Sequence, residues 1–249
     1  MPDHFDAHFH IIDPRFPLVP NNGFLPDPFT VADYRERVEP LRVAGGAVVS
    51  GSFQAFDQGY LKAALTQLGS GFVGVTQIPA DTTDDDILAL AHAGIRAVRF
   101  NLYRGGSATL DDIDALARRV HEVAGWHCEF YLDAADLTEL EPILAALPQI
   151  SIDHLGMSDD TTGALLRLVE SGTVVKATGF GRINITDPDA LMRDIVAVNP
   201  AALIFGSDLP STRAAIPFRD SDIDRIAGAV GAEHVDAVLA TNAHAFYRL

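Results

Sequence analysis

The sequence predicts an α/β fold, a single (β/α)8 TIM barrel with a Pro-rich loop after its first strand. Short apolar segments alternate with amphipathic helical segments along most of the chain, which is the pattern of repeated βα units. About eight apolar segments can be distinguished, as a closed barrel requires, and the length of 249 residues suits one such barrel. A doubly wound open sheet is the structural alternative.

The predicted strands are short and apolar on both faces, as expected for parallel strands covered by helices. The first spans residues 5–12, and a loop with five prolines follows it at 13–30. A loop of this length inside a compact domain usually has a function. The other strands are predicted at residues 46–53, 71–78, 95–102, 127–133, 149–155, 173–180 and 203–208.

Helices are predicted between these strands. Thr83 and the acidic residues after it mark the start of a helix at 87–92, and further helical patterns lie at 113–123 and 190–198. No linker, low-complexity tract or block of charge divides the chain. Residues 1–249 are therefore expected to form one domain.

Composition narrows the class of partner. The net charge of −16 argues against nucleic acid, because phosphate binding needs a basic face, and it does not favour anionic membranes. The single cysteine, Cys128, cannot form an internal disulfide, so a reducing cytoplasm is the expected location. No signal peptide or segment long enough to span a bilayer is evident. The expected partners are small molecules, and formation of a homo-oligomer remains open.

The first predicted strand contains a His-x-His pair. Regular alternation would place Asp6, His8 and His10 on one side and would place Phe9 and Ile11 on the other. Two imidazoles that point the same way suit either the coordination of a metal ion or the polarisation of a carbonyl group. This strand is therefore the first candidate for the functional site.

Polar residues recur at the carboxyl ends of the other strands, where the active-site mouth of a barrel lies. Such a convergent set is harder to explain as scattered surface residues than one or two isolated side chains. The candidates at or just beyond these strand ends are Ser50, Ser52, Arg99, Asn101, Tyr131, Asp133, His154, Lys176, Thr178, Arg182 and Asp208.

Five motifs follow one another from Asp6 to the C-terminus. They are Asp6-Ala7-His8-Phe9-His10, Gly94-Ile95-Arg96-Ala97-Val98-Arg99-Phe100-Asn101, Ile152-Asp153-His154-Leu155-Gly156, Gly206-Ser207-Asp208-Leu209-Pro210 and Thr241-Asn242-Ala243-His244-Ala245-Phe246-Tyr247. Together these motifs resemble the amidohydrolase superfamily, most closely its branch typified by 2-pyrone-4,6-dicarboxylate lactonase.

The resemblance implies a (β/α)8 hydrolase in which Asp208 activates a water molecule. His8, His10 and His154 would then polarise the scissile carbonyl, either directly or through a metal ion. This chemistry is physically sound, because an ionised carboxylate within hydrogen-bond reach is a competent base and donors aimed at an oxyanion lower the barrier.

Binuclear members of the superfamily use a carboxylated lysine or a glutamate on strand four and a histidine on strand five. This chain has Arg99 and Tyr131 in those regions, so a binuclear site is not expected. The prediction is catalysis without a cofactor. The alternative is one divalent ion such as zinc held by His8, His10 and Asp208, with His154 as a further ligand.

An anionic substrate is expected because three arginines, Arg99, Arg104 and Arg182, lie near the predicted mouth. Two segments depart from the lactonase pattern. Met157 replaces an arginine, and the residues after Asp208 differ, so the substrate need not be the same. Arg213 is a candidate to replace the lost charge. The predicted substrate-binding residues are Arg99, Arg104, Tyr131, Arg182, Ser52 and Arg213.

Three functional interpretations follow. The first is a hydrolase that opens a small anionic lactone in the catabolism of aromatic or sugar acids. The second is a mononuclear metal-dependent amidohydrolase or decarboxylase that acts on a small carboxylate, for which a chelator would abolish activity. The third is a non-catalytic acid-binding barrel, for which Asp208→Asn would have no effect on function.

Overall fold

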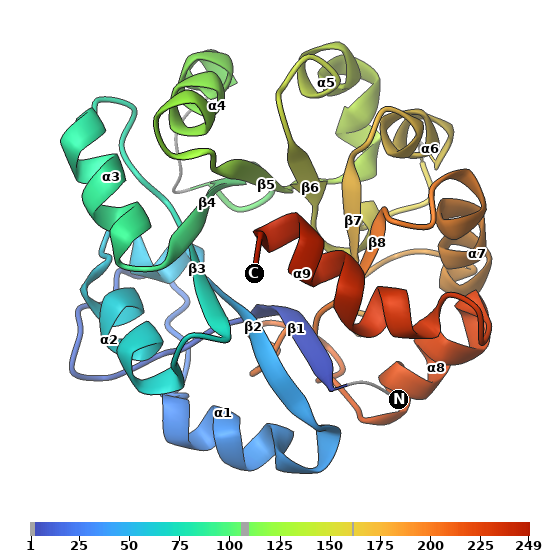
Figure 1. Cartoon of the computed structure of the whole chain (residues 1–249), viewed down its shortest axis with the longest axis horizontal. Helices are drawn as coiled ribbons and strands as arrows, with labels where there is room; N and C mark the ends of the chain where they lie inside the picture. The colour runs from blue at the N-terminus through green and yellow to red at the C-terminus, as the bar shows by residue number, and fades with distance from the viewer. Residues whose placement is uncertain (1–2, 106–109, 161) are drawn as a thin grey trace.

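The computed structural model describes residues 3–105, 110–160 and 162–249, and in these residues the predicted (β/α)8 barrel is confirmed. The strands pair in parallel, each with the next along the chain, in the order β1 to β8. Figure 1 shows them at the centre of a ring of helices. The strands are β1 (His4–Phe9), β2 (Val43–Val49), β3 (Phe72–Thr76), β4 (Ile95–Asn101), β5 (His127–Tyr131), β6 (Ile150–Ile152), β7 (Val174–Ala177) and β8 (Leu203–Phe205).

Each helix of the ring follows a strand and buries its apolar face against the sheet. None of the helices in the described ranges is long and apolar enough to cross a membrane. The helices are α1 (Val31–Val38), α2 (Gly59–Leu68), α3 (Asp84–His92), α4 (Leu110–Ala124), α5 (Leu137–Leu144), α6 (Thr162–Glu170), α7 (Pro188–Val198), α8 (Ser221–Val230) and α9 (Asn242–Tyr247), with short helical turns η1 (Glu39–Leu41), η2 (Ser52–Gln54), η3 (Ala134–Asp136), η4 (His154–Gly156) and η5 (Ala237–Thr241).

The strands end earlier than the apolar pattern predicts. The prediction of a strand at 149–155 is wrong at its end, because β6 stops at Ile152 and a helical turn, η4, begins at His154. The strand predicted at 203–208 likewise stops at Phe205. Buried residues continue past both strand ends, so hydrophobicity alone does not mark the ends.

The barrel closes where the chain beyond β8 meets β1. The backbone N–H of Asp208 donates to the His8 carbonyl and that of His10 donates to the Leu209 carbonyl, both at 2.7 Å. Gly206 allows this approach, because a Cβ there would lie 2.7 Å from the Cβ of His8. We call this junction the β1–β8 seam.

Asp6 joins the two sides of the seam with its side chain. Its carboxylate accepts hydrogen bonds from the backbone N–H of Ser207 at 2.8 Å and from the Ser207 hydroxyl at 2.6 Å. The hydroxyl of Tyr34, on α1, donates to it as well, at 3.0 Å. Burial raises the pKa of Asp6 to about 6, although these donors favour the ionised form.

The prediction that Asp6 shares a side with His8 and His10 is wrong. The register of β1 against β2 shifts between Asp6 and Phe9, as a β-bulge would cause. Asp6 and Phe9 both contact Tyr34, whose ring stacks on that of Phe9 with centroids 3.8 Å apart. The extra residue lets His8 join His10 in the barrel interior while Asp6 faces the helical layer.

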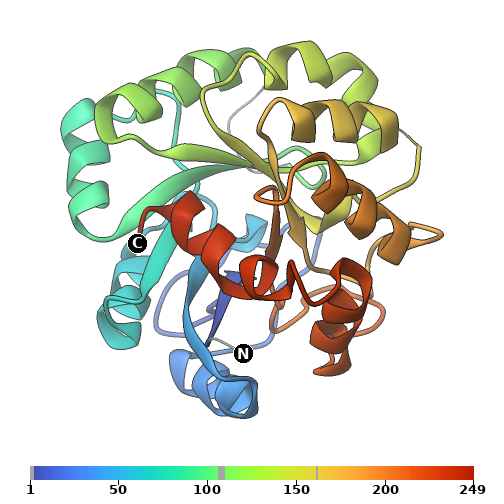
Figure 2. The ribbon, with the colours of Figure 1, turned by 45° about the vertical axis from the view of Figure 1, so that its right-hand side comes forward.

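The C-terminal helix closes the end of the barrel opposite the carboxyl ends of the strands. In Figures 1 and 2, α9 crosses the end of the barrel at which the strands begin. Its side chains Ala243, Phe246 and Tyr247 form a second apolar cluster with inward-facing residues such as Phe5 and Ala7. Water is thereby excluded from this end, which leaves the other end as the route into the barrel.

Residues 13–30, which we call the β1 loop, contain no helix or regular strand and extend over the carboxyl end of the barrel. Val19 donates from its backbone N–H to the Phe53 carbonyl at 2.8 Å. The Asn21 side chain donates to the Arg104 carbonyl at 3.2 Å, and the guanidinium of Arg213 donates to the Asn21 carbonyl at 2.5 Å. The loop is therefore tied to three segments that follow different strands.

Removal of the seam carboxylate should destabilise the fold. Asp6→Ala is expected to lower the free energy of unfolding by about 3 kcal/mol or more, because several buried donors lose their acceptor. Asp33→Ala is a matched control. Asp33 accepts hydrogen bonds from the backbone N–H and the hydroxyl of Thr30, both at 2.7 Å, but at an exposed helix start. Its loss should cost only about 1 kcal/mol. Urea unfolding followed by circular dichroism measures both, and equal losses would contradict the role of Asp6.

Candidate active site

A small polar cavity of about 30 Å³ lies at the carboxyl ends of the strands. Eight of the ten predicted site residues line it, and the other two, His8 and Asp208, are fully buried beside it. The structure thus brings the predicted residues together. The lining residues are His10, Gly51, Ser52, Phe53, Arg99, Asn101, Arg104, Tyr131, His154, Arg182, Thr212 and Arg213.

Asp208 follows β8 in a left-handed backbone conformation, with φ of 61°. Its Oδ2 accepts a hydrogen bond from Nε of Arg182 at 2.8 Å, whereas its Oδ1 is buried without a hydrogen-bond partner among the described residues. Burial alone would raise the pKa of Asp208, but the Arg182 guanidinium and the neighbouring histidines together outweigh it and hold the pKa below its usual range. The site therefore keeps an ionised carboxylate with one oxygen available to a ligand.

Two imidazoles of the first strand face that free oxygen. Nε2 of His10 lies 3.8 Å and Nε2 of His8 lies 3.9 Å from Oδ1 of Asp208. The other nitrogen of His10, Nδ1, lies 2.7 Å from the Val49 carbonyl, which can only accept. A neutral His10 must therefore carry its proton on Nδ1 and present a lone pair at Nε2.

The third histidine, His154, lies in η4 and also has a left-handed backbone, with φ of 53°. Its ring is 4.9 Å from that of His8 and 5.0 Å from that of Tyr131 between centroids. Gly179 makes room for it, because a Cβ there would lie 2.6 Å from Nδ1 of His154. Burial lowers the pKa of His154 well below its usual value and lowers that of His8 to about 4, so both rings are neutral near pH 7.

Four arginines contribute to the cavity in different ways. Arg99 is committed to protein partners, since it binds Asp153 through two nitrogens at 2.8 and 3.1 Å and the Ser50 carbonyl at 2.9 Å. Arg182 holds Asp208. Arg104 and Arg213 lie at the rim, where burial and the neighbouring Arg104 lower the pKa of Arg213. The rim is therefore cationic, although the chain as a whole is acidic.

Sequence reasoning named Lys176 as a candidate but missed Glu129, the buried carboxylate that pairs with it beneath the cavity. Nζ of Lys176 lies 2.5 Å from Oε2 of Glu129 and 3.4 Å from Oδ1 of Asp153. Tyr247 of α9 donates to the other oxygen of Glu129 at 2.6 Å. The signal that could have found this pair is a charged residue inside each of two mostly apolar strands, one acidic and one basic.

Three candidate metal ligands lie close together. Ligand atoms of His8, His154 and Asp208 all lie within 4.8 Å of one another, and Oδ1 of Asp208 and Nε2 of His8 lack hydrogen-bond partners in the described part of the chain. Nitrogen and carboxylate donors of this kind suit one zinc ion. A second group, His8, Glu129 and Asp153, is also close enough, but the ammonium group of Lys176 lies among its members.

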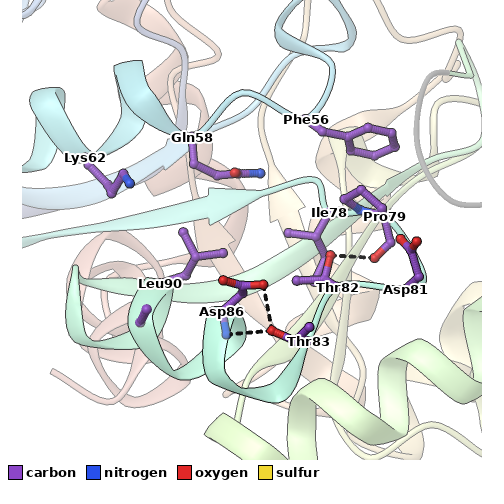
Figure 3. A pocket seen from close by; sticks show the side chains of 11 residues that line it. Phe56, Gln58, Lys62, Ile78, Pro79, Asp81, Thr82, Thr83, Asp86 and Leu90 are labelled. Carbon is purple, nitrogen blue, oxygen red and sulfur yellow. Dashed lines mark hydrogen bonds between the residues drawn. The ribbon is translucent and has the colours of Figure 1, made fainter.

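A larger groove lies outside the barrel, between α2 and α3, with a volume of about 520 Å³ (Figure 3). Its walls include Phe56, Lys62 and Leu90, and none of the predicted site residues lines it. The Thr83 hydroxyl is engaged with Asp86 at 2.6 Å, as an N-terminal cap of α3. This groove shows no convergence of titratable groups comparable to that of the polar cavity.

Known proteins share the sequence and the fold. A 2-pyrone-4,6-dicarboxylate hydrolase of Comamonas testosteroni is 27% identical over 232 residues, which cover 82% of this chain and 76% of that protein. A D-galactarolactone isomerase of Agrobacterium fabrum is 26% identical over 224 residues, or 82% of this chain and 75% of the relative. The crystal structure of a probable 2-pyrone-4,6-dicarboxylic acid hydrolase of Acinetobacter baumannii covers all of both chains with a TM-score of 0.84 at 22% identity, which supports the fold.

The family profile described as amidohydrolase matches residues 5–249, nearly the whole chain. The match includes both sides of the β1–β8 seam, the three histidines of the site and Asp208. The chain therefore belongs to the amidohydrolase family and is an enzyme of the hydrolase class.

Proposed function

We propose that this enzyme hydrolyses the ester bond of a small lactone that carries carboxylate groups. The observation that carries the proposal is the free oxygen of Asp208, which faces two histidine nitrogens at 3.8 and 3.9 Å beside a cavity with a cationic rim. The names of the two curated relatives, one a dicarboxylate lactone hydrolase and the other a lactone isomerase, point to the same class of substrate.

The base in this mechanism is Asp208. A water molecule between Oδ1 of Asp208 and Nε2 of His10 would find two acceptors, one for each of its protons. Asp208 takes one proton as the water oxygen attacks the lactone carbonyl carbon. The proton then passes to the ring oxygen as the carbon–oxygen bond breaks, which gives the open hydroxy acid and restores the carboxylate.

The carbonyl oxygen becomes negatively charged as the water attacks. The rings of His8 and His154 lie beside Asp208, and a proton on the nitrogen that faces the substrate would stabilise this charge. Because both rings are neutral, each can donate only one such proton. Arg182 keeps Asp208 ionised and oriented throughout.

Binding of the anionic substrate is assigned to the rim. Arg104 and Arg213 carry charge at every relevant pH and have the planar geometry that matches a carboxylate. Tyr131 and Ser52 add hydroxyl groups to the cavity wall. Arg99 has a different role in this proposal, because its contacts with Asp153 and the Ser50 carbonyl make it an orienting group for the cavity floor.

We propose further that the reaction needs no metal ion. Were one bound, His8, His154 and Asp208 would hold it, with His10 3.8 Å from the same carboxylate, and it would supply Lewis-acid polarisation of the carbonyl. One observation favours the metal-free reaction. The guanidinium of Arg182 already neutralises Asp208, so a second cation beside the same carboxylate would be repelled.

Asp208→Asn should abolish hydrolysis of anionic lactones. We expect kcat to fall by about 10²–10⁴-fold, because the amide cannot accept the proton of water. Asp27→Asn is the control for loss of one negative charge near the mouth, and it should retain activity. The assay uses 2-pyrone-4,6-dicarboxylate and D-galactarolactone as substrates. Undiminished turnover by Asp208→Asn would refute the proposed base, whereas tight binding without turnover by the unaltered enzyme would indicate a binding protein.

The rim arginines should select for charge. Arg104→Gln and Arg213→Gln are each expected to raise KM for an anionic lactone about ten-fold, since a charge-assisted hydrogen bond is lost. KM for an uncharged lactone should change little. Arg118→Gln, which removes an exposed arginine of α4 that pairs with Asp114, serves as the control. Equal effects on charged and uncharged substrates would argue against carboxylate recognition at the rim.

Metal removal should leave activity intact. Prolonged treatment with 1,10-phenanthroline followed by gel filtration is expected to yield an active enzyme, and elemental analysis should find no stoichiometric zinc. Loss of activity that zinc restores would instead support the mononuclear metal-dependent amidohydrolase or decarboxylase.

A further inference from the structure

The buried Lys176 lies among three acceptors. Its side chain is fully buried, and Nζ lies 2.5 Å from Oε2 of Glu129, 3.4 Å from Oδ1 of Asp153 and 3.3 Å from Nδ1 of His8. A protonated lysine has three N–H groups and no lone pair. Glu129 and His8 lie in hydrogen-bonding geometry to Nζ, whereas Oδ1 of Asp153 accepts no hydrogen bond from the described residues.

Nδ1 of His8 has two neighbours with opposite requirements. Lys176 can only donate to this nitrogen, so it requires a lone pair there. Asp153, whose Oδ1 lies 3.3 Å from the same nitrogen, can only accept while it is ionised, so it requires a proton there. A neutral imidazole carries one proton, so these requirements correspond to its two tautomers. If Nδ1 has the lone pair, Nε2 presents a proton to the active site. If Nδ1 has the proton, Nε2 presents a lone pair.

The contacts favour the tautomer of His8 that has a lone pair on Nδ1 and a proton on Nε2. A proton on Nδ1 would point at an ammonium group 3.3 Å away that has no lone pair to accept it, whereas a lone pair there receives one of the lysine protons. The negative charge of Asp153 is balanced without a proton from His8, because Arg99 donates to its Oδ2 twice and Lys176 lies near its Oδ1. Glu129 holds the ammonium group in place at 2.5 Å.

We propose that Lys176 is a positioning residue that fixes His8 in the tautomer with its proton on Nε2. The first imidazole of the His-x-His pair then presents a donor to the substrate, while His10, fixed by the Val49 carbonyl, presents a lone pair. His8 in this state cannot ligate a metal ion through Nε2. The tautomer depends only on the contacts of Lys176, whereas the use of the donor at a carbonyl oxygen rests on the proposed function.

Nuclear magnetic resonance of the ring nitrogens tests the tautomer directly. In the enzyme labelled with ¹⁵N-histidine, long-range ¹H–¹⁵N correlation spectra distinguish a protonated from an unprotonated ring nitrogen. Signals of His8 are assigned by their loss in His8→Gln. We expect Nε2 of His8 to be protonated and Nδ1 to be unprotonated, with the reverse for His10. A proton on Nδ1 of His8 would overturn the proposal, and this spectrum decides the matter without any variant of Lys176.

A charge-balanced double variant tests the cause. Lys176→Met with Glu129→Gln removes one positive and one negative charge together and preserves the approximate volume of both side chains. His8 should then move its proton to Nδ1, toward Asp153, and zinc affinity measured by calorimetry should rise at least ten-fold over the unaltered enzyme. Glu129→Gln alone retains Lys176 and should retain the original tautomer. An unchanged tautomer in the double variant would refute the role of Lys176.

The outcome is independent of the substrate assignment. An enzyme that hydrolyses none of the lactones but shows His8 protonated on Nε2 would refute the proposed function and support the tautomer. An active lactone hydrolase with His8 protonated on Nδ1 would do the opposite.

Discussion

The hydrogen bonds between the Asp6 carboxylate and Ser207 are the interaction on which the rest of the structure depends. They hold the first strand against the segment after the last one, at the place where the barrel must close. His8 lies two residues beyond Asp6, and Asp208 directly follows Ser207, so the same contact sets the distance between the histidine pair and the proposed base. Closure of the barrel therefore also assembles the site. The bulge in β1 lets the same strand direct Asp6 to the seam and His8 into the barrel interior.

The interior of the barrel carries an unusual density of charge for a buried region. Buried ions are stable only when they are paired and hydrogen-bonded, because desolvation otherwise exceeds their attraction. Here each carboxylate below the cavity has a cationic partner, Lys176 for Glu129 and Arg99 for Asp153. Burial would raise the pKa of Asp153, but the adjoining His8 ring and the Lys176 and Arg99 charges together outweigh it and hold that pKa well below its usual range. These paired charges beneath the cavity therefore orient the neutral histidine rings.

The sequence was sufficient for the barrel and for the members of the cavity, but it was insufficient for their orientation. Alternation predicted βα units and the polar strand ends, because these depend on local patterns. It misplaced Asp6, since a single inserted residue reverses the side on which every earlier residue points and leaves no mark in composition. It also overlooked Glu129 as the partner of Lys176, because the two residues lie 47 positions apart in the chain and become neighbours only when the barrel forms.

The proposed reactive residues occupy strained backbone, and this strain explains how short strands can present them. His154 and Asp208 both have positive φ outside glycine, a state that costs on the order of 1–3 kcal/mol per residue. Local hydrogen bonds hold each turn, from Met157 N–H to the His154 carbonyl at 2.9 Å and from Ser211 N–H to the Asp208 carbonyl at 2.6 Å. A regular continuation of the strands would have sent successive side chains to alternate faces. The tight turns instead direct both side chains inward immediately after β6 and β8, so the barrel gives up some stability to bring an imidazole and a carboxylate to the same point.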